Sequence, residues 1–263
     1  MVKVLLDQGI IPGIKVDKGG QPLPGSPKEI VTNGLDGLTD RLDEYASLGA
    51  RFTKWRGVIS IDDGIPTRHC IDTNAHALAR FAALSQKSGL VPIVEPEVLM
   101  DGNHDIDRCF AVTEATLREV FYQLAQHNVS LEGCLLKPNM VLSGGSAANR
   151  AGAEEVAEKT LACFKRVIPA AVPGIVFLSG GQSDNEATLN LDAINKCAAK
   201  TGAPWQLSFS FGRGLQQATL KAWIGKDDNS QKAKQAFYHR AKLTSVARQG
   251  KYTSEMENAT SRS

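Results

Sequence analysis

The stretch LEGCLLKPNMVLSGG, residues 131–145, places a lysine directly after a short apolar run and follows it with a proline. Leu135 and Leu136 are typical of a buried strand, and Pro138 ends that strand because proline has no amide hydrogen to donate. Burying the ammonium group of Lys137 without partners would cost considerable free energy. Either the strand simply ends there and the lysine reaches water, or the lysine belongs to a site that uses it.

Similar short apolar runs recur along the chain, with helical patterns between them. Together with the first stretch, the six runs are IIPGIKV (10–16), ARFTKWRG (50–57), LVPIVEPEV (90–98), GCLLKPNM (133–140), GIVFLSGG (174–181) and WQLSFSFGRG (205–214). Alternating strands and helices are the signature of βαβ units around a parallel sheet. The sequence therefore predicts an α/β fold, either an open doubly wound sheet or a (β/α)8 TIM barrel that lacks two of its eight strands.

Apolar residues spaced three and four apart indicate the helices between these runs. The clearest pattern is Leu35, Leu38 and Leu42, with Gly49 placed to end the helix in the left-handed conformation. Comparable spacing predicts further helices near residues 117–124, 156–167, 191–198, 213–224 and 230–248.

Composition describes an ordinary globular chain of 263 residues with a formal net charge of +2. No segment concentrates lysine and arginine enough to indicate nucleic-acid binding, and the five scattered cysteines are typical of a reduced, cytoplasmic protein. No apolar run approaches the ~20 residues that a membrane span needs, so we expect neither a membrane anchor nor a signal peptide. We expect one domain over residues 1–250 and a flexible polar tail over 251–263.

Charged or anion-binding residues recur at the C-terminal ends of the runs. They are Lys15, Lys54, Glu95, Lys137 and Arg213, and the fifth run ends in Ser179, Gly180 and Gly181. Barrel enzymes assemble their active sites from side chains at these strand ends. The pattern therefore favours the barrel over the doubly wound sheet.

Two of the runs carry pairs of charges on one face. Because side chains alternate along a strand, Lys54 and Arg56 share a face, and Trp55 points to the opposite side. Glu95 and Glu97 share a face for the same reason. Two carboxylates near several cations can hold one group as an acid and another as a base. Solvated strand ends or ordinary salt bridges would explain each residue singly, and only their convergence on one rim favours catalysis.

The sequence offers no metal-binding or nucleotide-binding motif. The five histidines lack metal-ligand spacing, and HDID at 104–107 lacks the glycine and glutamate positions of a calcium loop. SGGSAANRAG at 143–152 is neither a dinucleotide fingerprint nor a P-loop, so we interpret it as a surface connection. We therefore expect no metal and no cofactor.

A lysine at a strand end has a specific chemical use. Its neutral amine can form a Schiff base with a carbonyl substrate, for which the usual lysine pKa of about 10.4 must fall toward ~7–8. Partial burial and a neighbouring cation are the two effects that lower a lysine pKa in this way. Leu135, Leu136 and Lys54 could supply both effects, so Lys137 is the candidate nucleophile.

Ten stretches spread from residue 13 to residue 253 carry a family resemblance. They are GIKVDKG (13–19), GLDGL (34–38), KWRGV (54–58), VPIVEPEVL (91–99), LLKPNMV (135–141), FLSGGQS (177–183), LDAINKC (191–197), SFGRGLQ (210–216), LKAWIGK (220–226) and QGKYT (249–253). Together they closely resemble the class I fructose-bisphosphate aldolases.

This resemblance implies a TIM barrel and a glycolytic lyase that reversibly cleaves fructose 1,6-bisphosphate into dihydroxyacetone phosphate and glyceraldehyde 3-phosphate, without a metal or cofactor. It implies a Schiff base on Lys137 and an acid/base role for Glu95. Glu97 and Lys54 would orient groups and tune the charge of the site. The substrate-binding residues that it implies are Lys15, Arg56, Ser179, Gly180, Gly181, Ser210, Gly212 and Arg213.

The resemblance also implies a barrel without its first two strands, because members of the family extend further on the N-terminal side. The first of these strands carries an aspartate that assists cleavage of the carbon–carbon bond. A cytoplasmic homotetramer with a sugar-phosphate substrate, and with neither nucleic acid nor membrane as a partner, is the further expectation. Two hypotheses are therefore open. The chain is either a Schiff-base aldolase or a catalytically impaired relative that only binds sugar phosphates or associates with other subunits.

Overall fold

A six-stranded parallel sheet forms the centre of the computed structural model, which describes residues 2–258. Its strands, in their order across the sheet, are β1 (Gly13–Lys15), β4 (Phe52–Ile59), β5 (Val91–Val98), β6 (Leu135–Leu136), β7 (Gly174–Phe177) and β8 (Gln206–Phe209). Each strand overlaps one of the six apolar runs, so the predicted strands are confirmed.

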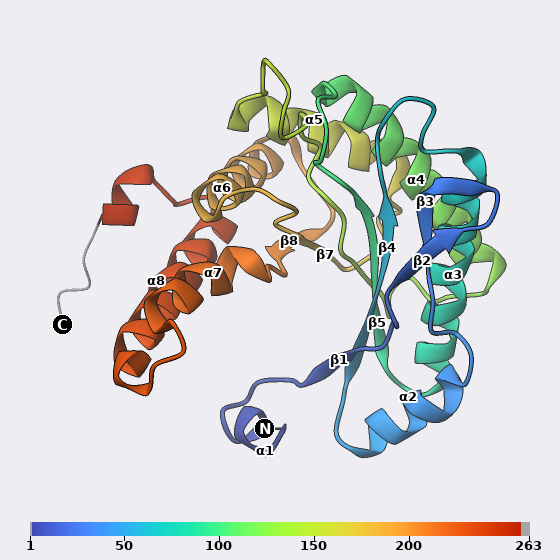
Figure 1. Cartoon of the computed structure of the whole chain (residues 1–263), viewed down its shortest axis with the longest axis horizontal. Helices are drawn as coiled ribbons and strands as arrows, with labels where there is room; N and C mark the ends of the chain where they lie inside the picture. Colours follow the sequence, from blue (N-terminus) through green and yellow to red (C-terminus); the bar gives the residue numbers. More distant parts are fainter. Residues whose placement is uncertain (1, 259–263) are drawn as a thin grey trace.

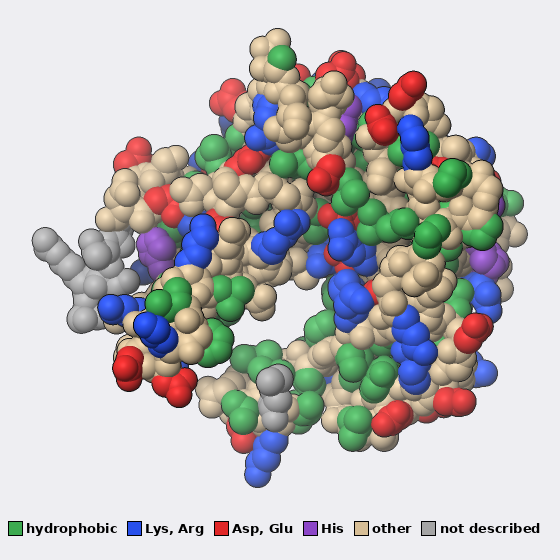
Figure 2. All heavy atoms as spheres, viewed as in Figure 1, with side chains coloured by type: hydrophobic (Ala, Val, Ile, Leu, Met, Phe, Trp, Pro, Cys, Tyr) green, Lys and Arg blue, Asp and Glu red, His purple; other side chains and the backbone are tan. Residues whose placement is uncertain are grey.

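The winding of this sheet separates the two predicted architectures. Neighbours in the sheet are also neighbours along the chain, so the sheet winds in one direction. A doubly wound sheet would reverse its order at a switch point. The helices lie outside the sheet (Figure 1), and its inner face borders the hollow visible in Figure 2. The fold is therefore of the TIM-barrel type, and within the described residues the outer edges of β1 and β8 have no partner strand.

The bounds of the helices are α1 (Val2–Asp7), α2 (Leu38–Ser47), α3 (Arg68–Lys87), α4 (Ile106–Gln126), α5 (Ala153–Val167), α6 (Asp184–Thr201), α7 (Arg213–Trp223) and α8 (Ser230–Arg248), with 3-10 turns η1 (Asp227–Asn229) and η2 (Ser254–Asn258). Helices α2 and α4 to α8 overlap the predicted helices, whereas α1 and α3 were not predicted. Gly49 follows α2 with a φ of 103°, in the conformation expected of a helix-ending glycine.

Helix α3 was not predicted, although it is one of the longest in the chain. Four of its ten buried residues are alanine, among them Ala75, Ala79 and Ala82. Alanine favours helix formation but contributes a weak hydrophobic periodicity. The helix is therefore specified by composition more than by the spacing of large apolar residues.

A hairpin of β2 (Gly20–Leu23) and β3 (Ser26–Thr32) was also not predicted. It packs on β4 and α3. Its buried residue Glu29 accepts hydrogen bonds from the amide and hydroxyl of Thr67 at 2.8 and 2.5 Å. Because Thr67 caps α3, this contact fixes the start of that helix.

The hydrophobic core lies between the outer face of the sheet and the surrounding helices. Along β4, buried and partly exposed side chains alternate strictly. Trp55 is fully buried and stacks on Phe81 of α3, with ring centroids 5.7 Å apart. Packing on this outer face directs the alternate residues of β4, Lys54 and Arg56, to the inner face, as the sequence predicted.

The segment after α8 folds back onto the domain. The amide of Tyr252 donates to a carboxylate of α6 at 2.8 Å, and its hydroxyl donates to Glu257 at 2.7 Å. Glu257 also pairs with the buried Arg240 at 2.5 Å. These contacts hold the segment through η2, and the flexible tail stays a prediction for residues 259–263, which lie outside the described residues.

All five cysteines are free thiols, and four of them are buried, in agreement with the predicted reduced core. In the part of the chain that the structure describes, no helix is long and apolar enough to span a bilayer.

Candidate active site

Strands β4, β5 and β6 bring five charged side chains together at their C-terminal ends. We call Lys54, Arg56, Glu95, Glu97 and Lys137 the charge cluster. Lys54 and Arg56 belong to β4, both glutamates belong to β5, and Lys137 follows the last residue of β6. The amide of Lys137 donates to the backbone of β5 at 2.8 Å. This bond extends the pairing beyond β6 and fixes the lysine beside Glu95.

Glu95 lies between two ammonium groups. Its Oε1 atom is 3.0 Å from Lys137 Nζ, and its Oε2 atom pairs with Lys54. Glu95 is 3% exposed and Lys137 is 8% exposed. Buried charges are tolerated when they are paired, and a carboxylate in contact with an amine can carry a proton between that amine and a bound substrate.

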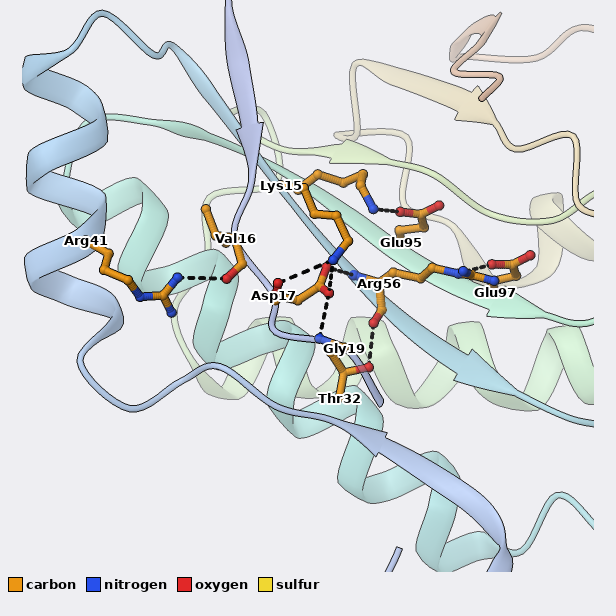
Figure 3. A network of polar contacts seen from close by, with 10 residues as sticks. Lys15, Val16, Asp17, Gly19, Thr32, Arg41, Arg56, Glu95 and Glu97 are labelled. Carbon is orange, nitrogen blue, oxygen red and sulfur yellow. Dashed lines mark hydrogen bonds and ion pairs between the residues drawn. The ribbon is translucent and has the colours of Figure 1, made fainter. Parts of the chain in front are cut away.

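Glu97 is equally buried and pairs with Arg56 (Figure 3). Burial raises the pKa of the Glu97 carboxyl, and the Arg56 guanidinium opposes part of that rise. A carboxyl with a raised pKa exchanges protons closer to neutral pH. The two glutamates of β5 therefore have different surroundings, one between two amines and one beside a guanidinium.

Lys15 reaches the inner face next to Lys54, with which it is in register, but its ammonium group turns to Asp17. The carboxylate of Asp17 also accepts the amide hydrogens of Arg56 and Gly19 at 3.3 and 3.2 Å (Figure 3). We did not single out Asp17 in the sequence. Its position two residues after Lys15, which places both side chains on one face of an extended chain, was the signal that could have found it.

The loop after β7 holds backbone donors in place of charged side chains. We call Ser179, Gly180 and Gly181 the phosphate loop, after the role that the family resemblance implies for them. Gly180 and Gly181 have φ angles of 53° and 88°, and within the described residues neither amide has a hydrogen-bond partner. Successive backbone amides without partners in a turn form a concavity that binds anions. A side chain at Gly180 would place its Cβ atom 2.5 Å from Leu178 Cδ1, so glycine also fits this site sterically.

The end of β8 lies beside the phosphate loop. The amide of Ser210 donates to the end of β7 at 2.8 Å, and Gly212 precedes α7, whose first residue is Arg213. Arg213 and Gly181 line the same cavity of about 560 Å³. A guanidinium and a helix N-terminus both favour a bound anion.

The phosphate loop adjoins the charge cluster. A Cβ atom built on Gly180 would lie 3.8 Å from Glu97 Oε1, and the amide of Leu178 donates to the carbonyl of Pro138 at 3.2 Å. The structure therefore gathers the predicted residues on one rim, except that the ammonium of Lys15 turns to Asp17. Among the residues that the structure describes, no group of three or more His, Cys, Asp or Glu side chains could hold a metal ion.

Comparison with known proteins identifies relatives over nearly the whole chain. Residues 1–263 match the family model described as "Glycolytic: Fructose-bisphosphate aldolase class-I". A Xanthomonas campestris protein named probable fructose-bisphosphate aldolase class 1 is 57% identical over 252 residues, which are 95% of this chain and 74% of that protein. Fructose-bisphosphate aldolase 4, cytosolic, from Arabidopsis thaliana is 51% identical over 256 residues, which are 97% of this chain and 65% of that protein.

A solved structure gives the same result. The fructose-bisphosphate aldolase of Plasmodium falciparum, in a ternary co-crystal with TRAP and a small molecule inhibitor, has a TM-score of 0.92 to this chain at 47% identity. The match covers 96% of this chain and 72% of that chain.

Proposed function

Because this chain belongs to the class I fructose-bisphosphate aldolase family, we propose that it cleaves fructose 1,6-bisphosphate reversibly into dihydroxyacetone phosphate and glyceraldehyde 3-phosphate through a Schiff base on Lys137. The contact of 3.0 Å between Lys137 Nζ and Glu95 Oε1, in buried surroundings, is the observation that supports this role best. An amine must lose a proton before it attacks a carbonyl, and the carboxylate is placed to accept it.

Schiff-base formation uses the two contacts of Glu95. Lys137 Nζ adds to the ketone carbon of the substrate, and Glu95 returns a proton to the carbinolamine oxygen, which leaves as water. Lys54 holds the other oxygen of the same carboxylate and so keeps Glu95 oriented toward Lys137. The product of this step is an iminium ion that joins the substrate to the protein.

The iminium ion is the electron sink for cleavage of the C3–C4 bond. The electron pair of that bond passes to the iminium group and gives an enamine. Glu95, which lies beside Lys137 and gave up its proton in the previous step, accepts the proton of the C4 hydroxyl, and the aldehyde is released. Protonation of the enamine and hydrolysis then free dihydroxyacetone phosphate and restore the amine. Glu97 and Lys54 would orient the reacting groups and balance charge during these steps.

The two phosphate groups of the substrate would bind on either side of Lys137. One phosphate accepts hydrogen bonds from the phosphate loop, from Ser210 and Gly212, and from the guanidinium of Arg213. Lys15 and Arg56 would contact the sugar and its other phosphate. Binding at both ends would hold the ketone carbon near Lys137, which is the positioning effect that lowers the barrier of a two-reactant step.

We also propose a cytoplasmic location and a homo-oligomeric assembly, a tetramer as in the family. The word "cytosolic" in the name of the Arabidopsis relative supports the location. Exposed apolar side chains on α7 and α8, among them Trp223, Phe237 and Tyr238, offer a surface for subunit contacts.

Trapping of the Schiff base tests the proposal directly. The chain is incubated with dihydroxyacetone phosphate and borohydride, and the reduced adduct is located by peptide mass spectrometry. We expect the adduct on Lys137, none in Lys137→Met, and an unchanged yield in Lys200→Met, which alters an exposed lysine of α6. Folded, unaltered chain that acquires no adduct on Lys137 would instead support the binding-only alternative, which needs no buried amine beside a carboxylate.

A further inference from the structure

A chain of buried amide groups lies behind the phosphate loop. Gln182 and Asn190 are 7% and 4% exposed. Gln182 Nε2 donates to the carbonyl oxygen of Ser179 at 2.9 Å, and the backbone amide of Gln182 donates to the same oxygen at 3.1 Å. Asn190 Nδ2, from α6, donates to Gln182 Oε1 at 2.7 Å. The chain therefore runs from the body of α6 to one carbonyl group of the loop.

Two buried side-chain amides are an uncommon way to fill this space. Burying an amide costs free energy unless its donors and acceptor are bonded, whereas an apolar side chain of similar size needs no partners. Here both ends of the Gln182 amide and the Nδ2 atom of Asn190 are bonded: Gln182 Oε1 to Asn190, and Gln182 Nε2 to Ser179 and, more weakly, to Met140 Sδ at 3.7 Å. The specific result of this arrangement is a carbonyl of Ser179 that is bound twice and directed inward.

The direction of that carbonyl decides where the next amide points. In a trans peptide unit the C=O and N–H bonds point in opposite directions, so an inward carbonyl of Ser179 sends the amide hydrogen of Gly180 outward. If this peptide unit turned over, it would present an oxygen atom to the anion instead of a hydrogen. Gly180 has no Cβ to resist such a flip, so the loop itself does not prevent it.

We propose that Gln182 and Asn190 are positioning residues, which hold the Ser179–Gly180 peptide unit in the orientation that binds the substrate phosphate. This inference rests on the proposed function, since it assigns the phosphate loop to one end of the substrate. Neither residue touches the anion. They act through the carbonyl of Ser179, so loss of their hydrogen bonds should lower the affinity of the loop for phosphate.

Comparison of two trapping substrates tests this role. Dihydroxyacetone phosphate carries the phosphate group, and dihydroxyacetone presents the same ketone to Lys137 without it. In Gln182→Met and in Asn190→Leu we expect the half-saturating concentration of dihydroxyacetone phosphate to rise roughly tenfold, the effect of about one lost hydrogen bond to an ionised group. Trapping of dihydroxyacetone should stay unchanged, because its binding makes no use of the loop.

Two variants serve as controls. Because Gln182 and Asn190 act in one chain, the double variant should show about the same loss as either single variant. Asn195→Leu removes another amide of α6, one that donates within the helix to Leu191 at 2.9 Å, and should leave both substrates unaffected. Equal losses for both substrates, or no loss for either, would show that the two residues do not position the loop.

A binding measurement keeps this inference separate from the Schiff-base proposal. The amide signals of Gly180 and Gly181 are followed by NMR during titration with inorganic phosphate, which needs no reaction at Lys137. We expect both signals to move in the unaltered chain, and the dissociation constant to rise roughly tenfold in Gln182→Met. An unchanged dissociation constant overturns the positioning role even if trapping succeeds. If trapping fails but the dissociation constant of Gln182→Met is raised, the result counts against the Schiff base alone.

Discussion

The charge cluster and the phosphate loop are neighbours on one rim, but they are prepared for substrate in opposite ways. In the charge cluster both buried carboxylates already have cationic partners: Glu95 has Lys54 and Lys137, and Glu97 has Arg56. In the phosphate loop the backbone amides have no partner within the described residues. Proton transfer needs a carboxylate in contact with the groups between which the proton moves. Anion binding needs backbone amides that have no hydrogen-bond partner before the anion arrives.

Because of this difference, substitutions in the two regions should affect different measured quantities. Removing one member of the charge cluster leaves an opposite charge buried without a partner, so both turnover and stability should suffer. Altering the phosphate loop changes the direction or spacing of neutral amides, so affinity should suffer and chemistry should not.

The largest effect should come from Lys137→Met. Without the amine no Schiff base forms, so cleavage of fructose 1,6-bisphosphate should fall by roughly 10⁴-fold or more. Binding of inorganic phosphate, followed by the amide signals of Gly180 and Gly181, should stay within about twofold of the unaltered chain, a change of under ~0.5 kcal/mol. If phosphate binding fell along with cleavage, the two regions would not be independent.

The next effect should come from Glu95→Gln. Loss of a positioned acid/base group lowers kcat by roughly 10²–10⁴-fold, as a coupled cleavage assay would show. Lys54 and Lys137 would also lose their shared counter-charge, so urea unfolding should report a stability loss of about 3 kcal/mol. Glu114→Gln, which removes two exposed ion pairs of α4, with Arg118 and with Arg166, should cost less than ~1 kcal/mol and leave kcat unchanged.

A smaller and different effect should follow Gly180→Ala in the phosphate loop. Its φ of 53° and the near contact with Leu178 make the alanine backbone shift, so KM should rise roughly tenfold while kcat changes less than about threefold. Gly225→Ala is a matched control, because Gly225 has a φ of 72° but no neighbour within 4 Å and lies after α7. A fall in kcat equal to the rise in KM would contradict the division.

The smallest effect concerns the pH dependence of stability. The pKa of Glu97 in the folded chain lies above the ordinary value of 4.5, so the folded state binds this proton more tightly than the unfolded state. Unfolding free energy therefore falls as the pH rises from 4.5 through the folded pKa.

Glu97→Gln should reduce that fall, as urea unfolding at about pH 5 and about pH 7 would show. Arg166 holds the pKa of Glu114 below its ordinary value of 4.5, so Glu114→Gln should change only the loss of stability as the pH falls below 4.5, and it should leave the fall between about pH 5 and about pH 7 unchanged. Equal curves for the two variants would contradict the assigned direction.

The sequence predicted the charge cluster better than it predicted the support around it. The alternation of side chains along a strand placed Lys54 with Arg56 and Glu95 with Glu97, and one buried face in β4 was enough to fix that register. The same reasoning placed Lys15 on the rim but could not assign its partner. A flexible lysine chooses among nearby carboxylates, and only the folded positions show that Asp17 is the one it contacts.

In the phosphate loop the sequence predicted the site but not the orientation of its peptide units. Two adjacent glycines after a strand indicate a turn, and the resemblance to a family indicated an anion site, but neither shows which way a peptide unit faces. That orientation depends on Gln182 and Asn190, which are eight residues apart and meet through the hydrogen bond that Asn190 of α6 donates to Gln182. Helix α3 was not predicted for a simpler reason: its alanine residues give only a weak hydrophobic periodicity.

The order of the strands also bears on how such a protein can change by descent. The charge cluster comes from β4, β5 and β6, and the phosphate loop and its neighbours come from β7 and β8. The connection 143–152, which is mostly exposed after residue 144, lies between the two stretches of chain. Mutations in the later stretch can adapt the phosphate loop and its neighbours to a different sugar phosphate. They leave Lys137 and Glu95, which belong to the earlier stretch, unchanged. Substrate preference can therefore change through mutations in the later stretch while the reaction, which depends on the earlier stretch, stays the same.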